Sequence, residues 1–308
     1  MELWIHPDSP RNANRVSRAQ SSGKIRRECW DRFPAHIYPV LGVSRIGCHN
    51  ASMQIGEFLR QKVLAVQEYS LMSWTAITNI VRRPFYAADF YTQADLIGVG
   101  SLPIVMLTGF FTGGVLALQS ATTLAQFGAK AVTGELVSLS MIKELGPVLT
   151  GLMVSGRNAS GMASELGSMQ VTEQIDAMRA LGTDPLKKLV TPRIYSTVLM
   201  LFFLTILSDA LGIFGGGLIS TTMLGLDLSQ YFHTAYQTLK YPDILEGLIK
   251  PVFFGFIIAT VGCYFGLSTR GGTQGVGRST TQAVVVSSVL IIAMDFVISR
   301  VMIGIFGR

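Results

Sequence analysis

Residues 96–119 read LIGVGSLPIVMLTGFFTGGVLALQ, and this stretch decides the fold class. Asp, Glu, Lys and Arg are absent from the whole interval between Asp95 and Lys130. About 20 apolar residues in a helix cross the hydrocarbon core of a bilayer, so the stretch is predicted to span a membrane. Three glycines inside it would let another helix approach closely: Gly109, Gly113 and Gly114.

The composition of the whole chain agrees with a membrane protein. Of its 308 residues, 49% are hydrophobic and 14% charged, whereas soluble domains carry about 25% charged residues. The sequence predicts an all-α integral membrane protein with about five transmembrane helices, at roughly 97–119, 141–165, 192–222, 249–269 and 280–306. The third is long enough to tilt or break around Gly212 and the glycine run 215–217.

The chain divides into three parts on composition. Residues 1–52 hold eight Arg or Lys against four Asp or Glu without apolar periodicity, so little fixed structure is expected. They are interpreted as a leader before a true start at Met53, with an organelle transit peptide as the alternative. Residues 53–92 form the second part, in which apolar positions recur at helical spacing over 55–81. This pattern predicts an amphipathic interfacial helix ahead of the transmembrane part, residues 93–308.

Basic residues cluster in alternate loops, which indicates the orientation of the chain. With five spans, the basic loops at 82–83, 187–193 and 270–278 all lie on one side. The positive-inside rule then places the N-terminus in the cytoplasm. The net charge of +6 is thereby explained by membrane topology, and nucleic acid is not expected as a partner.

Residues 168–193, SMQVTEQIDAMRALGTDPLKKLVTPR, predict a short helix in a cytoplasmic loop. Thr172 is the expected N-cap, and Glu173 and Asp176 suit the positive first turn. Gly182 is expected to end the helix. Such a short helix is marginal alone, so its apolar stripe indicates docking onto a partner or onto the protein itself. The candidate docking residues are Thr172, Glu173, Gln174, Ile175, Asp176, Met178 and Leu181.

Residues 143–165, KELGPVLTGLMVSGRNASGMASE, place four charges in or near the second span: Lys143, Glu144, Arg157 and Glu165. A charge at the centre of a spanning helix costs about 2.5–3.5 kcal/mol on insertion scales, so such residues are usually paired or face a cavity. We expect them to couple movements or to fix helices. Asp209 and Asp295, inside the third and fifth predicted spans, carry the same two interpretations.

Catalytic, cofactor-binding and metal-binding residues are not expected. The cysteines, at 29, 48 and 263, have no paired spacing. The stretch GGTQGVGRST at 271–280 approaches the phosphate-loop pattern, but it follows a predicted membrane helix and has Arg278 where that loop needs lysine. A glycine-rich cytoplasmic turn explains it better.

Several stretches closely resemble the MlaE/YrbE permeases, the membrane subunits of ABC-type lipid transporters that work with MCE proteins. The longest is KELGPVLTGLMVSGRNASGMASELGSMQVTEQIDAMRALGTDPLKKLVTPR at 143–193. RRPF at 82–85, LTGFFTGGVLALQ at 107–119 and GGTQGVGRSTTQAVV at 271–285 also match, in the right order. The resemblance covers about 55–308.

The resemblance implies a homodimer in the inner membrane that moves phospholipid or another lipid across the periplasm and helps to maintain outer membrane lipid asymmetry. It implies a cytoplasmic, MlaF-like ABC ATPase that binds ATP and Mg²⁺, a periplasmic MlaD-like MCE protein, and a small regulatory STAS-type subunit. The short helix at 172–182 would be the coupling helix that enters a groove of the ATPase.

Two other classes of protein stay open at this point. An ion-coupled carrier would use its intramembrane charges to bind protons or substrate. A membrane scaffold would recruit a soluble partner through 172–182 without transport.

Overall fold

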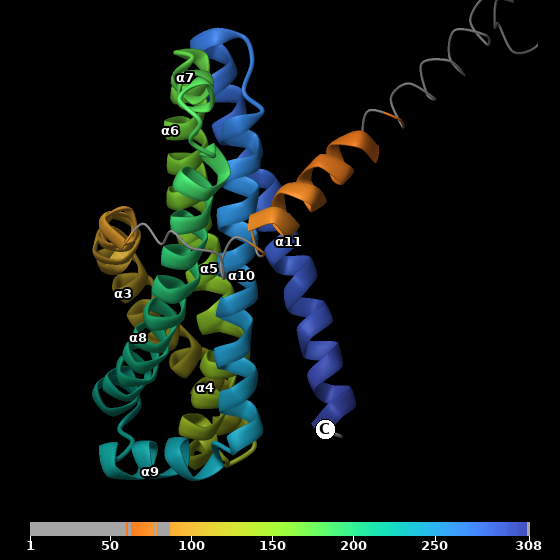
Figure 1. Cartoon of the computed structure of the whole chain (residues 1–308). Helices are drawn as coiled ribbons and strands as arrows, with labels where there is room; N and C mark the ends of the chain where they lie inside the picture. Colours follow the sequence, from red (N-terminus) through yellow and green to blue (C-terminus); the bar gives the residue numbers. More distant parts are fainter. Residues whose placement is uncertain (1–59, 61–62, 77, 79–86, 307–308) are drawn as a thin grey trace, which may run out of the picture. The chain divides into compact units, whose positions relative to one another are not determined.

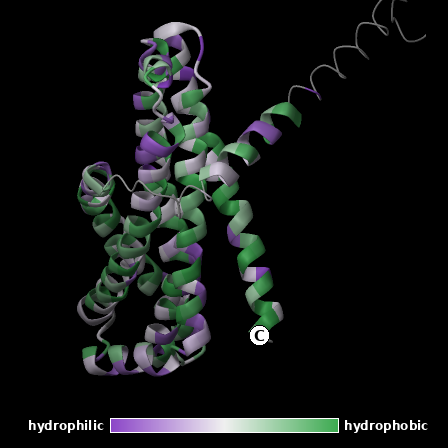
Figure 2. Cartoon of the chain, in the orientation of Figure 1, coloured by the Kyte–Doolittle hydropathy of each residue, from purple (hydrophilic) through white to green (hydrophobic). Residues whose placement is uncertain are grey.

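The structure of the protein is a computed structural model that describes residues 60, 63–76, 78 and 87–306. Residues 65–308 form one compact unit, to which the fold below refers. Its described part is helical, and five segments are long and apolar enough to cross a membrane, as predicted (Figure 1). They are Ala87–Gln126, Lys130–Val171, Leu186–Met223, Tyr241–Leu267 and Gly272–Phe306. Hydrophobic residues make up much of these helices (Figure 2).

Helices α3 (Ala87–Gln126) and α8 (Thr191–Leu224) pack side by side and run parallel. Glycine makes the approach possible, as expected: a Cβ on Gly109 would lie 2.7 Å from the Ser208 carbonyl oxygen, and one on Gly113 would overlap the backbone of Gly212. Of the tilt or break predicted for the third span, the break does not occur, because α8 is continuous. Its glycines serve close packing instead of a bend.

The second span is one run of helix with two irregular turns. It contains α4 (Thr133–Ser140), α5 (Gly146–Val154) and α6 (Ser160–Val171). Wider π-helical turns, Met141–Leu145 and Ser155–Ala159, join these three segments. Such turns are rare and occur frequently at functional sites.

Helix α10 (Tyr241–Leu267) is the most buried span and α11 (Gly272–Phe306) the least. The main apolar core lies around α10, where Phe254 and Ile258 are fully buried against the second span and α11. Toward its C-terminal end, α11 diverges from α10 (Figure 1). The C-terminal half of α11 therefore depends on few contacts.

Two short helices lie at opposite ends of the bundle: α7 (Gln174–Ala180), which connects the second and third spans, and α9 (Leu228–Thr238), which follows the third (Figure 1). Tyr231 anchors α9, because its side chain packs on Gly216 and Gly217 and its hydroxyl donates to the Ile213 carbonyl oxygen at 3.3 Å. Burial raises the pKa of Tyr231.

Only the middle of the predicted interfacial helix, 55–81, lies within the described residues, and 63–76 are helical there. The Tyr69 hydroxyl hydrogen-bonds Thr260 Oγ1 of α10 at 2.8 Å. Leu71 and Trp74 are exposed, which fits a helix that lies on the bundle with apolar side chains toward the membrane. The leader prediction for 1–52 lies outside the described residues.

Candidate functional site

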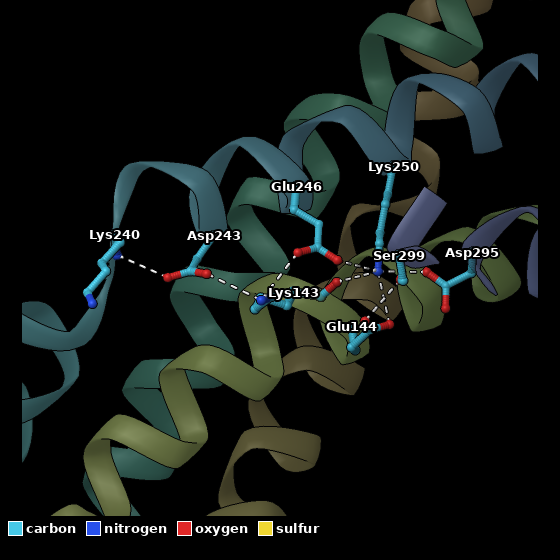
Figure 3. Close-up of polar contacts among 8 residues, drawn as sticks. All are labelled: Lys143, Glu144, Lys240, Asp243, Glu246, Lys250, Asp295 and Ser299. Carbon is cyan, nitrogen blue, oxygen red and sulfur yellow. Dashed lines mark hydrogen bonds and ion pairs between the residues drawn. The ribbon is translucent and has the colours of Figure 1, made fainter. Parts of the chain in front are cut away.

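Six charged side chains from three spans gather inside the bundle, and we term this group the charge cluster (Figure 3). Its members are Lys143, Glu144, Asp243, Glu246, Lys250 and Asp295. Lys250 of α10 lies at the centre with a fully buried side chain. Its Nζ lies 2.9 Å from a carboxylate oxygen of Glu144 and 2.9 Å from one of Asp295. An ammonium group this deep requires such partners, because an unpaired buried charge is strongly unfavourable.

A proline explains one further contact of Lys250. In a regular helix the Lys143 carbonyl oxygen would accept from the N–H of residue 147, but Pro147 has no N–H. Lys250 Nζ donates to that carbonyl oxygen at 2.7 Å. The π-helical turn, the proline and the buried lysine therefore form one local arrangement.

Lys143 binds the outer pair of carboxylates in the cluster. Its Nζ lies 3.2 Å from Asp243 and 3.3 Å from Glu246, both of which are nearly buried on the first turns of α10. Glu246 also lies 3.7 Å from Lys250 Nζ. Two lysines are thus shared among four carboxylates, so the cluster has an excess of acidic groups.

The cluster also attaches α11 to the rest of the bundle. Asp295 comes from α11, and Ser299, one turn later, donates from its hydroxyl to Glu144 at 3.1 Å. A second polar contact lies nearer the N-terminus of α11, where the Ser155 and Ser287 hydroxyls are 2.6 Å apart. These contacts hold the least buried span against the second span.

Lys143, Glu144 and Asp295 stand out in the sequence as charges within predicted spans, whereas Asp243, Glu246 and Lys250 were not among the predicted site residues. Asp243 and Glu246 lie outside the predicted fourth span, which was expected to begin near residue 249. The sequence feature that could have revealed these residues is their spacing. Asp243, Glu246 and Lys250 are three and four residues apart and therefore share one helix face.

The other two charges predicted for the second span do not pair with each other. Glu165 forms an ion pair of 2.8 Å with Arg193, a nearly buried residue at the start of α8. Arg157 lies in the second π-helical turn, exposed, with its guanidinium against Gly100 of α3. Among the described residues, no acidic group forms an ion pair with Arg157.

Asp209 of α8 is buried, and its carboxyl group lies against Gly146, where a Cβ would overlap it. Its Oδ1 has no hydrogen-bond partner among the described residues. Gly146 is therefore required for this packing, and Asp209 is separate from the charge cluster.

Helix α7 corrects two predictions about residues 168–193. Thr172 does not cap it: its hydroxyl donates to the Ser168 carbonyl oxygen at the end of α6. Glu173 occupies the N-cap position with a left-handed backbone, φ 59°, and its side chain makes no capping bond. The chain turns sharply between two helices here, which a simple N-cap pattern does not reveal.

The apolar stripe of α7 was predicted to dock onto a partner or onto the protein itself. Ile175 is fully buried and packs with side chains at the end of α6 and the start of α8, among them Leu166 and Val190. Met178 is half-buried beside them, whereas Leu181 is 83% exposed. The stripe thus fixes α7 to its own bundle and leaves Leu181 outside.

The outward face of α7 is polar except for Leu181. Glu173, Gln174 and Asp176 are exposed, and Arg179 Nη1 lies 2.8 Å from Asp176 Oδ1. The surface that a partner could reach therefore combines acidic groups with one large apolar side chain.

The glycine-rich stretch at 271–280 was predicted to be a turn, but only its start is one. Gly271 and Gly272 have positive φ, and α11 begins at Gly272 directly after α10. The strand that a phosphate loop follows is absent at this point of the chain. Over the described residues, no group of three or more His, Cys, Asp or Glu side chains could hold a metal ion.

Five apolar spans around a buried charge cluster define a multi-pass helical membrane protein. Comparison with known proteins identifies its family. The family model of the permease MlaE matches residues 90–301, and the chain belongs to this family.

Curated relatives agree with this assignment. A probable ABC transporter permease protein of Rickettsia bellii is 41% identical over 251 residues, which are 82% of this chain and 97% of that protein. The intermembrane phospholipid transport system permease protein MlaE of Haemophilus influenzae is 35% identical over 213 residues, 69% of this chain and 82% of the relative. The chloroplastic protein trigalactosyldiacylglycerol 1 of Arabidopsis thaliana is 35% identical over 229 residues, 74% of this chain and 65% of the relative.

Proposed function

We propose that this chain is the membrane-spanning permease subunit of an ATP-driven phospholipid transporter. The observation that carries the proposal is the family match over residues 90–301, together with a relative named for intermembrane phospholipid transport. The chain itself is a permease and not an enzyme. It supplies the membrane passage, and ATP is hydrolysed elsewhere.

The assembly that we infer contains two copies of this permease, two MlaF-like ABC ATPase subunits that bind ATP and Mg²⁺, and a periplasmic MlaD-like MCE protein. A small STAS-type subunit on the ATPase completes it. We place the assembly in the inner membrane with the N-terminus in the cytoplasm. The basic loops at 187–193 and 270–278 support this orientation, because they lie at the end of the bundle that carries α7.

Helix α7 is the proposed contact with the ATPase. It projects from one end of the bundle, and Leu181 and the acidic residues Glu173 and Asp176 are exposed on it. Because Ile175 fixes α7 to the ends of α6 and α8, a displacement of α7 would be transmitted to the second and third spans. The charge cluster would then carry movement between the second span, α10 and α11.

The test is affinity purification of the tagged chain in mild detergent from its native membranes, followed by mass spectrometry of the bound proteins. The proposal expects an ABC ATPase and an MCE protein. Leu181→Asp should release the ATPase and retain the MCE protein. The matched control is Phe127→Asp, at a side chain that is 77% exposed and lies in the connection between the first two spans, whereas α7 connects the second span to the third. Recovery of the chain without any ATPase would overturn the proposal.

An ion-coupled carrier was the alternative, and the family match does not favour it. In the structure Asp295 and Glu144 are both bound to Lys250, and Asp209 is buried apart from them. Glu144 and Asp295 are therefore explained by helix fixation.

A further inference from the structure

Helix α9 has an apolar surface that is wider than its contact with the bundle. At about 100° per residue, its apolar side chains occupy one continuous arc of the helix. Tyr231 and Ala235 take one part of the arc and are buried against the bundle. Leu228, Phe232 and Tyr236 take the adjoining part and are 47%, 37% and 81% exposed.

The opposite side of α9 is polar and uncharged. Ser229, Gln230, His233 and Gln237 are exposed there, and the His233 and Gln237 side chains hydrogen-bond each other at 3.1 Å. The helix contains no Asp, Glu, Lys or Arg. Its N-cap, Asp227, is exposed and accepts from the Ser229 N–H at 3.3 Å, so this charge lies at the start of the helix and not along its polar side.

The exposed stripe continues the apolar outer surface of the spans. Helix α9 follows α8 after three residues and lies across the end of the bundle (Figure 1). The last turns of α8 expose Leu218 and Met223. After α9, the first turn of α10 exposes Tyr241 and Ile244. A stripe bordered on both sides by membrane-facing side chains lies beside lipid as well.

We propose that α9 is a second interfacial helix, in which Leu228, Phe232 and Tyr236 enter the lipid layer at the end of the bundle opposite α7. Two features of the stripe fit this environment. Aromatic side chains are enriched where headgroups meet hydrocarbon. An amphipathic helix binds there with its apolar face in the lipid and its polar face in water. Tyr231 and the Ser138 hydroxyl, which donates to the Ala235 carbonyl oxygen at 3.1 Å, would fix the depth of the helix.

The test places single tryptophans on the two faces of α9. Trp4, Trp30 and Trp74 are first replaced by Phe in the full chain, which is then reconstituted into phosphatidylcholine vesicles with or without brominated acyl chains. Phe232→Trp and Tyr236→Trp report on the stripe. His233→Trp and Gln237→Trp, on the polar side of the same helix, are the matched controls.

The proposal expects brominated lipid to quench the stripe tryptophans about twofold more than the controls, because only the stripe lies within the lipid. Acrylamide should quench the controls more strongly. Equal quenching of both faces by acrylamide would overturn the proposal. Stripe tryptophans shielded from both quenchers would overturn it too, because a protein, such as a second copy of this chain, would then cover the stripe. Neither result depends on transport, so the test is independent of the proposed function.

Discussion

Replacement of Lys250 by methionine should be among the most destabilising changes in the spanning helices. Methionine keeps most of the volume of the lysine side chain and removes its ammonium group. Glu144, Asp295 and the Lys143 carbonyl oxygen, at 2.9, 2.9 and 2.7 Å, then lose their shared donor.

The magnitude follows from the burial of the groups left behind. Removal of one partner from a buried ion pair costs about 3–5 kcal/mol. The Glu144 side chain is 46% exposed and Asp295 19%, so solvent or lipid headgroups can reach both in part. The lower end of this range therefore applies, and we expect Lys250→Met to lower the free energy of unfolding by about 3 kcal/mol.

The assay is reversible unfolding of the purified chain in mixed detergent micelles, followed by circular dichroism. Arg179→Gln is the control, since it breaks an ion pair of 2.8 Å whose side chains are 60% and 56% exposed. Its cost should stay below about 1 kcal/mol. The double variant Lys250→Met/Asp295→Asn should regain about 1–3 kcal/mol, because it leaves one unpaired carboxylate fewer. Lys250→Met with no larger effect than Arg179→Gln would refute the reasoning.

Three further predictions concern α7 and the glycine contact. Replacement of both Glu173 and Asp176 by lysine should abolish the stimulation of lipid transport by ATP. The melting temperature should not change, because both side chains are exposed. Unchanged transport would contradict a coupling role. Ile175→Asp should destabilise the chain by about 3 kcal/mol in the same unfolding assay, since a carboxylate would enter a fully buried site. Gly113→Leu should separate α3 from α8 at Gly212 and lower the free energy of unfolding by at least about 1–3 kcal/mol. Gly156→Leu should have little effect on it, because a side chain at Gly156 would enter open space.

Most of the fold follows from the sequence because hydrocarbon imposes strong constraints. Long apolar stretches with few charges identified all five spans, and the glycines at 109 and 113 indicated a close helix contact that the structure confirms. The ends of the spans were less predictable. Helix α10 begins at Tyr241, because Asp243 and Glu246 form ion pairs with Lys143 and so can enter the helical bundle.

The site was predictable in part, for a related reason. A charge such as Glu144 inside an apolar run is visible in the sequence, but its partner on another helix depends on how the helices pack. For α7, the stripe of Ile175 and Leu181 was visible as well. Ile175 packs on the bundle and Leu181 does not, because the left-handed backbone of Glu173 sets the direction of the helix.

The attachment of α7 by Ile175 has a thermodynamic consequence for any protein that binds it. A free seven-residue helix would lose conformational entropy when it became ordered in a partner's groove. Here that loss has already occurred during folding, since α7 is held between the end of α6 and the start of α8. Binding energy gained at Leu181 and the acidic residues is therefore available to move the membrane helices rather than to form the helix that is being bound.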